Sequence, residues 1–286
     1  MPLTTTKKML KDAQKNHYAI GAFNFENMEM AQAVISAATE TGCPVILQTT
    51  PKTLGYGTPQ IFASMITAMA QEASIQVAIQ LDHGNSHDMV LDAMAAGYTA
   101  VMYDVSHLPF NENISTTQEL ANIAAERNIS IEAELGSIGG KEDDLEAEIE
   151  YTNPDAALEF VAQTGVNSLA VAIGTAHGVY KHTPILDINR LREIRKCVSI
   201  PLVLHGASGL QDNVVQDCIQ AGICKVNFAT ELRIAYTNGV REYLLANPEA
   251  YDPKTYGKAG YNRVKTLALQ KMAVCGLKGR LTNGNN

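Results

Sequence analysis

Eight short apolar runs recur along the chain, and most stay apolar through their middle instead of alternating with polar residues. Continuous apolar runs of four to eight residues are typical of parallel strands that are covered on both faces. We therefore expect eight strands of a parallel sheet. The runs are 18–24, 44–50, 76–82, 100–104, 130–136, 168–174, 201–207 and 224–229.

Helix-like segments lie between these runs, and several end at Gly or Asn, as helices commonly do. They include 27–42, 88–97, 116–128, 153–165, 187–197 and 211–222. Eight strand–helix units in 286 residues predict an α/β fold of the (β/α)8 barrel type. We expect one domain over 1–286, with 250–286 as a C-terminal helical tail. A doubly wound open sheet is the alternative, but no glycine fingerprint follows the first strand.

Composition excludes several classes of function. The formal net charge is −8 and Lys and Arg form no cluster, which argues against nucleic acid or an anionic membrane as a partner. No apolar run reaches the roughly 18 residues of a membrane span, and the N-terminus lacks the apolar core of a signal peptide. The five cysteines form no CxxC pair, so we expect reduced thiols in a cytoplasmic protein.

Histidines gather at one expected rim of the barrel, the end where strands lead into the following helices and where barrel active sites form. Of the seven histidines, His83, His177 and His205 follow strands three, six and seven. Three imidazoles without a fourth protein ligand predict a catalytic zinc site with an open coordination position. Asp104 and Glu134 end neighbouring strands and are expected to support these ligands or to form an alternate metal site.

Glycine-rich turns surround the two later histidines. GTAHG occupies 174–178 and HGASG occupies 205–209, and a helix is expected to start near Thr230. Loops after strands seven and eight of a barrel often bind phosphate through backbone N–H groups and a helix N-terminus. The sequence thus predicts a metal-assisted reaction on a phosphorylated small molecule.

The connection after the fifth strand, 136–155, is longer than usual for a barrel. Loops of this length are commonly lids or disordered segments. Its Gly-Gly pair comes shortly before Glu142, and we interpret Glu142 as a mobile acid or base. A solvated acidic run is the simpler interpretation of Glu146, Glu148 and Glu150.

Five motifs, in order and spread over nearly the whole chain, carry a family resemblance. They are LDHG at 81–84, EAELGSIGGKEDD at 132–144, SLAVAIGTAHGVY at 168–180, PLVLHGASGL at 201–210 and KVNFATEL at 225–232. Together they resemble the class II, zinc-dependent ketose-bisphosphate aldolases. The GTAHG, HGASG and NxATEL variants are similar to the tagatose-bisphosphate branch.

The resemblance implies the catalytic machinery. His83, His177 and His205 match the ligands of one Zn²⁺ per subunit. Asp82 matches the residue that exchanges a proton with the C4 hydroxyl of the sugar, and Glu142 matches the mobile-loop acid that moves a proton on the three-carbon donor. The resemblance also implies that zinc stabilises the enediolate. Asp104 and Glu134 match carboxylates that line the metal site.

The resemblance also implies the substrate and the partners. A ketose 1,6-bisphosphate is cleaved reversibly to dihydroxyacetone phosphate and glyceraldehyde 3-phosphate, with tagatose favoured and fructose or another ketose phosphate as alternatives. The family forms homodimers or homotetramers, and it places Na⁺ or K⁺ near Gly178 and Gly206. Lys258 falls where some members reach a neighbouring subunit's distal phosphate. The positions matched to substrate are Asn24, Thr50, Gly178, Gly206, Ser208, Asn227, Ala229, Thr230 and Lys258.

Some residues depart from the family pattern and leave the sugar's identity open. Glu26, Lys52 and Gln80 are expected to border the aldehyde half of the substrate, and Lys141 replaces a commonly different residue beside Glu142. A Schiff-base aldolase would need an inward lysine, for which Lys225 is the one candidate, although its strand could equally direct it outward. A non-catalytic barrel subunit that stabilises a partner and a metal-dependent hydrolase are the remaining alternatives.

Overall fold

A closed barrel of eight parallel strands forms the centre of the protein in a computed structural model, which describes residues 3–142, 145–147, 150–180, 182 and 184–276. Neighbouring strands follow one another in chain order, and β1 pairs with β11 to close the barrel. All eight expected strands are found, so the predicted (β/α)8 class is confirmed. The strands are β1 (Ile20–Asn24), β2 (Val45–Thr49), β3 (Val77–Gly84), β4 (Ala100–Tyr103), β5 (Ser130–Leu135), β8 (Ser168–Val171), β10 (Leu202–Leu204) and β11 (Ile223–Phe228).

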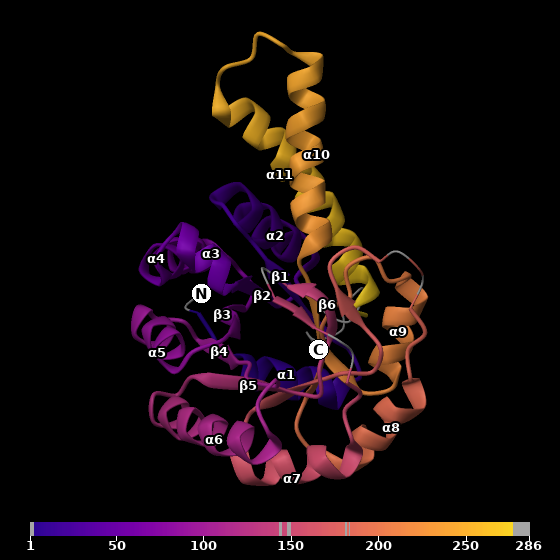
Figure 1. Ribbon diagram of the computed structural model, residues 1–286. Helices are drawn as coiled ribbons and strands as arrows, with labels where there is room; N and C mark the ends of the chain where they lie inside the picture. The colour runs from indigo at the N-terminus through magenta and orange to yellow at the C-terminus, as the bar shows by residue number, and fades with distance from the viewer. Residues whose placement is uncertain (1–2, 143–144, 148–149, 181, 183, 277–286) are drawn as a thin grey trace, which may run out of the picture.

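Helices surround the barrel as a ring (Figure 1). Side-chain caps fix where many of them begin; the Asn153 side chain, for instance, accepts from two backbone N–H groups, and Pro154 then fills the first helical position. The third helix of the prediction begins earlier than expected, at Phe110. The ring comprises α2 (Met28–Thr41), α3 (Pro51–Tyr56), α4 (Pro59–Glu72), α5 (His87–Ala96), α6 (Phe110–Glu126), α7 (Pro154–Thr164), α8 (Ile188–Cys197) and α9 (Asp212–Gln220).

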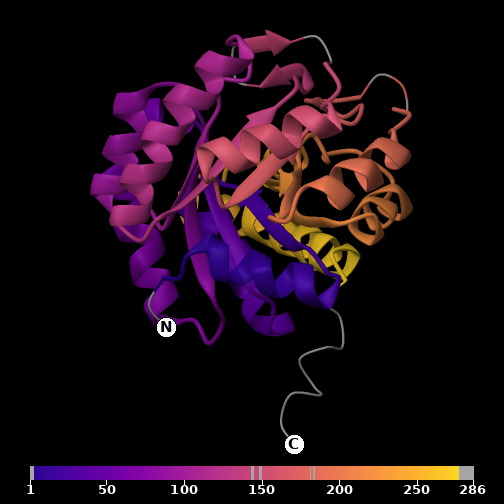
Figure 2. The same cartoon turned by 90° about the horizontal axis from the view of Figure 1, so that it is seen from below.

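The amino end of the barrel is covered by α1 (Thr6–Asn16). The backbone N–H of Lys7 donates to the Ser130 hydroxyl at 2.9 Å, and the N–H of Thr4 donates to the Val77 carbonyl at 2.9 Å, both at strand starts. Figure 2 shows α1 at the end of the barrel opposite the loops that follow the strands. The helix leaves the carboxyl ends of the strands as the accessible end.

Two long helices complete the chain, α10 (Thr230–Ala246) and α11 (Pro253–Val274). They pack on one another, and α11 also packs along α2. The end of α10 and the start of α11 project beyond the other helices (Figure 1). A C-terminal helical extension is therefore confirmed, while residues 277–286 of the expected tail lie outside the described residues.

The connection after β5 contains strands that the sequence analysis did not predict. β6 (Gly139–Glu142) and β7 (Leu145–Ala147) pair antiparallel, and β6 also pairs in parallel with β9 (Ala176–His177). Gly140 lies opposite His177 with φ 86°, and a Cβ there would collide with the His177 carbonyl oxygen. Only glycine permits this approach, which ties the long connection to the segment that carries His177.

The barrel interior is unusually polar. Met102, Ala170 and Val203 form a small apolar cluster separate from the main core, while Glu132 is buried beside Met102 in the strand register and Lys225 is opposite Val203. All five cysteines are free thiols, and within the described part of the chain no helix is long and apolar enough to cross a membrane.

Candidate active site

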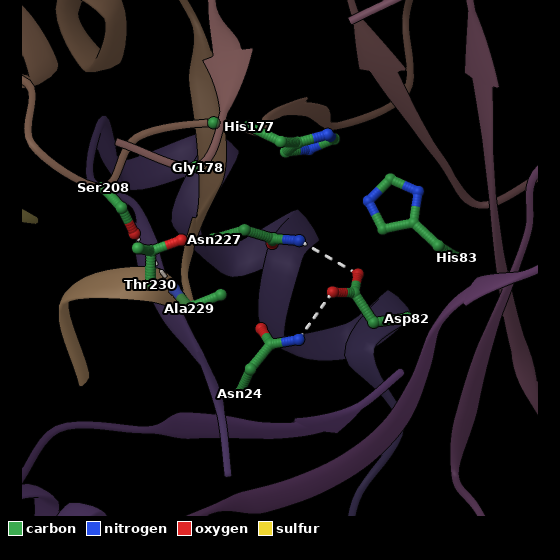
Figure 3. Close-up of a pocket in the computed structure, with 10 residues that line it drawn as sticks. Asn24, Asp82, His83, His177, Gly178, Ser208, Asn227, Ala229 and Thr230 are labelled. Atoms are coloured by element: carbon green, nitrogen blue, oxygen red, sulfur yellow. Dashed lines mark hydrogen bonds between the residues drawn. The ribbon is translucent and has the colours of Figure 1, made fainter. Parts of the chain in front are cut away.

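A pocket opens at the carboxyl ends of the strands, and every residue that lines it carries a site role predicted from the sequence. Figure 3 shows these side chains converging from the carboxyl ends of β1, β3 and β11, from the turns after β10 and β11, and from the segment that includes β9. The structure thus brings together at one rim residues that the strand ends and the family resemblance named, and their roles remain predictions. The lining residues are Asn24, Asp82, His83, His177, Gly178, Gly206, Ser208, Asn227, Ala229 and Thr230.

The three predicted histidines meet at one side of this pocket. The ring centroid of His83 lies 5.0 Å from that of His177 and 4.7 Å from that of His205. One ring nitrogen from each can be chosen so that all three atoms lie within 4.8 Å of one another. His83 has φ 50°, a left-handed conformation that is uncommon outside glycine and is found at functional sites.

Carboxylates hold the far nitrogens of two of these rings. Nδ1 of His83 lies 2.7 Å from Oδ2 of Asp104, and Nε2 of His205 lies 3.0 Å from Oε1 of Glu132. Burial by itself raises the pKa of Asp104, but the hydrogen bond and charge of His83 outweigh it and hold this pKa below its usual range. Burial likewise raises the pKa of Glu132, but Lys225 and His205 together lower it to about 2. Both carboxylates are therefore ionised, and each is placed to accept a ring N–H.

The nitrogens that remain face each other. Nε2 of His83 lies 2.9 Å from Nδ1 of His205. With protons on the far nitrogens, both facing nitrogens would present lone pairs, which repel unless a cation lies between them. In a tetrahedral site with Zn–N distances of about 2.0–2.1 Å, two ligand nitrogens are about 3.3 Å apart, so a shift of a few tenths of an ångström suffices. The residues present thus fit a zinc ion.

Burial keeps two of the rings in the form that binds metal. Burial is the main cause that lowers the pKa of His177, followed by the nearby charges of His83 and His205. Burial also lowers the pKa of His205, against the opposing influence of Glu132. Both rings are accordingly neutral near pH 7, and neutral imidazole is the form that coordinates metals.

Asp82 is held by three side-chain amides. Asn24 donates to Oδ2 at 2.8 Å and Asn227 donates to Oδ1 at 3.0 Å (Figure 3). Gln48 also donates to Oδ1, at 3.1 Å. Within the described residues, the carbonyl oxygens of these three amides are buried without a hydrogen-bond partner. Asn24 and Asn227 line the pocket, so their oxygens are placed to accept hydroxyl groups of a ligand there.

The far side of the pocket is built for an anion. Ser208 accepts from the backbone N–H of Ala229 at 3.1 Å, and α10 starts at the next residue, Thr230. Gly206 has φ 65°, and a Cβ there would lie 2.6 Å from the Ala176 carbonyl oxygen. A helix N-terminus beside glycine-rich turns presents backbone N–H groups and partial positive charge, which suits a phosphate.

Four other predicted residues lie outside the pocket lining. Thr50 is buried and its hydroxyl caps α3, and Lys258 is exposed on α11 with Nζ 3.6 Å from the centre of the Tyr261 ring. Glu134 lies beside Asp104, and burial followed by the charge of Asp104 raises its pKa well above the usual value.

The fourth is Glu142, which ends β6, two residues beyond the contact of that strand with His177. Its side chain, and that of the neighbouring departure Lys141, lie outside the described residues.

A second group of possible ligand atoms includes His83, Asp104 and Glu134, whose chosen atoms also lie within 4.8 Å of one another. This group shares His83 with the histidine cluster. The raised pKa of Glu134 favours its neutral carboxyl group. Carboxylate ligands must be deprotonated, so this second group is the weaker zinc site.

Sequence reasoning missed three residues that shape the site. Glu132 holds His205, Gln48 holds Asp82, and the Tyr180 hydroxyl accepts from the Ala176 N–H at 2.8 Å and donates to the Gly206 carbonyl at 2.7 Å. The alternation of strand residues could have revealed Glu132, since it lies two residues before Glu134.

The structure corrects the expectation for Gln80 and settles the direction of Lys225, which the sequence left open. Gln80 does not border the pocket; it is fully buried and donates to Oε2 of Glu132 at 3.2 Å. Lys225 does point into the barrel, but its Nζ lies 2.9 Å from both oxygens of Glu132, and no part of it is exposed. A Schiff base requires a neutral amine that substrate can reach, and this ion pair supplies neither.

Comparison with known proteins agrees with this geometry. The family model described as fructose-bisphosphate aldolase class-II matches residues 4–280. The YdjI aldolase from Escherichia coli K12 is similar in structure, with 36% identity, TM-score 0.86, and coverage of 97% of this chain and 99% of that one. A protein described as a putative fructose-1,6-biphosphate aldolase from Coccidioides immitis has 28% identity, TM-score 0.89, and coverage of 96% and 97%.

A third structure, the fructose-bisphosphate aldolase of Campylobacter jejuni, has 22% identity, TM-score 0.84, and coverage of 98% and 97%, and supports the fold. The chain belongs to the class II fructose-bisphosphate aldolase family. Its members are zinc-dependent aldehyde-lyases, and the protein is an enzyme of this class that acts on ketose phosphates.

Loss of a residue that only hydrogen-bonds to a metal ligand can lower metal affinity by roughly 100-fold. Replacing His177 with Ala should weaken zinc binding by more than that, because a direct ligand is lost. Glu134→Gln should leave zinc affinity nearly unchanged, as should His87→Ala, since His87 lies near Glu119 on the helical ring. Competition with a chromophoric chelator measures all three. Strong zinc binding that survives His177→Ala but is lost in Glu134→Gln would place the metal at the carboxylate group instead.

Proposed function

We propose that the protein reversibly cleaves a ketose 1,6-bisphosphate, with the tagatose sugar favoured, to dihydroxyacetone phosphate and glyceraldehyde 3-phosphate. The observation that carries this proposal is the pocket itself, in which His83, His177 and Asp82 face the anion-binding turn at Ser208 and Thr230. A three-carbon phosphate can place its phosphate at that turn and its oxygens toward the histidines. His205 completes the proposed zinc site from behind the pocket.

Asp82 is the proposed base of the cleavage step. As the C3–C4 bond breaks, its electron pair passes to the three-carbon fragment, and the proton of the C4 hydroxyl passes to Asp82 as C4 becomes an aldehyde. A zinc ion bound to the three histidines would supply Lewis-acid stabilisation of the negative charge that develops on that fragment. The amides of Asn24 and Asn227 hold the carboxylate in place and face the pocket.

Glu142 is the proposed acid that returns a proton to C3 of the three-carbon fragment. The support for this role is its place in β6, two residues beyond Gly140, which pairs with His177. A residue at this position on the connection can approach the reacting carbon from the open side of the pocket. Closure of such a connection would also exclude water from the carbanion.

The identity of the sugar depends on residues beside the pocket. Glu26 lies two residues beyond Asn24, accepts from Nε of Arg233 at 2.6 Å, and accepts from the Thr53 hydroxyl at 2.7 Å. Arg233 itself lies one helical turn beyond Thr230. We expect this group, together with Lys52, to meet the half of the substrate that becomes the aldehyde.

Assembly and ions complete the proposal. We expect a homodimer or homotetramer, in keeping with Leu245 and Tyr251, which are 75% and 89% exposed near the projecting ends of α10 and α11. Lys258 lies on the same projection and would reach the distal phosphate of a neighbouring subunit. Na⁺ or K⁺ is proposed near Gly178 and Gly206.

Zinc-loaded protein should cleave tagatose 1,6-bisphosphate with a higher kcat/KM than fructose 1,6-bisphosphate. Coupled detection of dihydroxyacetone phosphate measures both rates. EDTA should abolish cleavage and added zinc should restore it, since no other described group replaces the metal's charge. Cleavage that persists in EDTA would contradict the zinc mechanism, and a higher kcat/KM for fructose would contradict the choice of sugar. If neither sugar is cleaved, both are rejected as substrates. The remaining explanations would be another ketose phosphate as substrate or a missing partner chain.

Asp82→Asn should lower kcat by about 100- to 10,000-fold, because general acid–base catalysis contributes about that much. KM should change less, since the amide keeps the size of the carboxylate. The matched control is Asp88→Asn, which changes an exposed carboxylate on α5, and it should have normal kcat. Steady-state kinetics at equal zinc content compares them. A kcat near the wild-type value in Asp82→Asn would rule out the proposed base.

A further inference from the structure

A single carboxylate inside the barrel connects the proposed metal site to five strands. Glu132 is 2% exposed. Its Oε1 lies 3.0 Å from Nε2 of His205 and 2.9 Å from Nζ of Lys225. Its Oε2 accepts from Lys225 at 2.9 Å and from Gln80 and Ser168 at 3.2 Å each. These partners come from β3, β8, β11 and the end of β10, while Glu132 belongs to β5.

This set of contacts fixes the carboxylate in one orientation. A carboxylate has about four lone-pair positions, and the neighbours named above offer five contacts to its two oxygens. Any rotation loses bonds in a site with no water contact, which is costly for a buried charge. Lys225 is itself fully buried, so neither charge is tolerated without the other.

The ring of His205 has a competing neighbour. Nδ2 of Asn227 lies 3.2 Å from the same Nε2 that faces Glu132. An amide N–H there would favour a lone pair on Nε2 and a proton on Nδ1, which would point that proton at His83. The carboxylate favours the opposite tautomer, with the proton on Nε2 and the lone pair on Nδ1. The tautomer therefore depends on which neighbour dominates.

We propose that Glu132, neutralised by Lys225, is a positioning residue that fixes His205 with Nε2 protonated and the Nδ1 lone pair directed at His83. The inference rests on the proposed role of His205 as a metal ligand. The neutral pair orients the ring without adding net charge beneath the site. Asp104 performs the same orientation for His83 from a partly exposed position, at 19% side-chain exposure.

Two double variants test the acceptor without leaving an unpaired charge. Glu132→Gln with Lys225→Met keeps a carbonyl oxygen for His205, whereas Glu132→Leu with Lys225→Met removes it. Zinc affinity, measured by chelator competition, should stay within about threefold of wild type in the Gln variant and fall about 10- to 100-fold in the Leu variant. Equal zinc affinity in the two variants would overturn the proposal.

A spectroscopic measurement separates positioning from structural support. Long-range ¹H–¹⁵N correlation of full-length protein, zinc-loaded and metal-free, should show His205 protonated at Nε2 in wild type and in the Gln variant. The metal-free Leu variant should show a mixture or the other tautomer, with unchanged far-UV circular dichroism. The His205 signals are assigned by their loss in His205→Gln.

The wild-type spectrum decides the matter even if a double variant fails to fold. A proton on Nδ1 of His205 in the wild-type protein would overturn the proposal. Neither readout uses substrate, so failure of the aldolase assay with the expected tautomer would count against the proposed sugar alone. Absence of zinc binding with the expected tautomer would count against the metal assignment.

Discussion

Three neutral imidazole rings can direct lone pairs at one point only if the other nitrogen of each ring carries the proton. In this protein, carboxylates favour this for two rings: the partly exposed Asp104 for His83 and the buried Glu132 for His205. The barrel makes the arrangement possible, because residues from the ends of different strands meet at one rim while the interior accommodates the supporting carboxylate. The polar interior around Lys225 follows from this need, since an interior carboxylate requires a buried cation beside it.

The loops above the barrel add a second constraint by joining the halves of the pocket. Gly140 brings β6 against the backbone of His177, so the connection after β5 approaches the metal side. The hydroxyl of Tyr180 bridges the Ala176 N–H and the Gly206 carbonyl, so the anion-binding turn is tied to the same segment. The proposed zinc and phosphate sites are thus held at a fixed separation by backbone contacts, which favours one size of donor fragment.

Much of this arrangement could be predicted from the sequence. Buried parallel strands have a strong apolar signature, and polar residues at their ends predicted most of the pocket lining. Gly178, Gly206 and Ala229 came instead from the glycine-rich turns and the family resemblance. The hairpin after β5 was missed because its short strands lack an apolar pattern and depend on Gly140 fitting against His177. Thr50 caps α3 with its hydroxyl, a role that the sequence analysis did not name, and its substrate contact stays a prediction.

Glu132, Lys225 and Gln80 could have been found by a further step. Side chains two apart in a strand face the same way, so these residues share the inward face with Glu134, Asn227 and Asp82. The inward direction of Lys225 was left open because its partner charge comes from a strand 93 residues away in the chain. Pairing across a barrel depends on register, which a single sequence does not specify.

Diffraction from crystals of the zinc-loaded protein, collected at the zinc absorption edge, tests the central claim most directly. The account predicts one strong anomalous peak about 2.0–2.1 Å from Nε2 of His83, Nδ1 of His205 and a ring nitrogen of His177. A principal peak held by Asp104 and Glu134, away from His205, would contradict it.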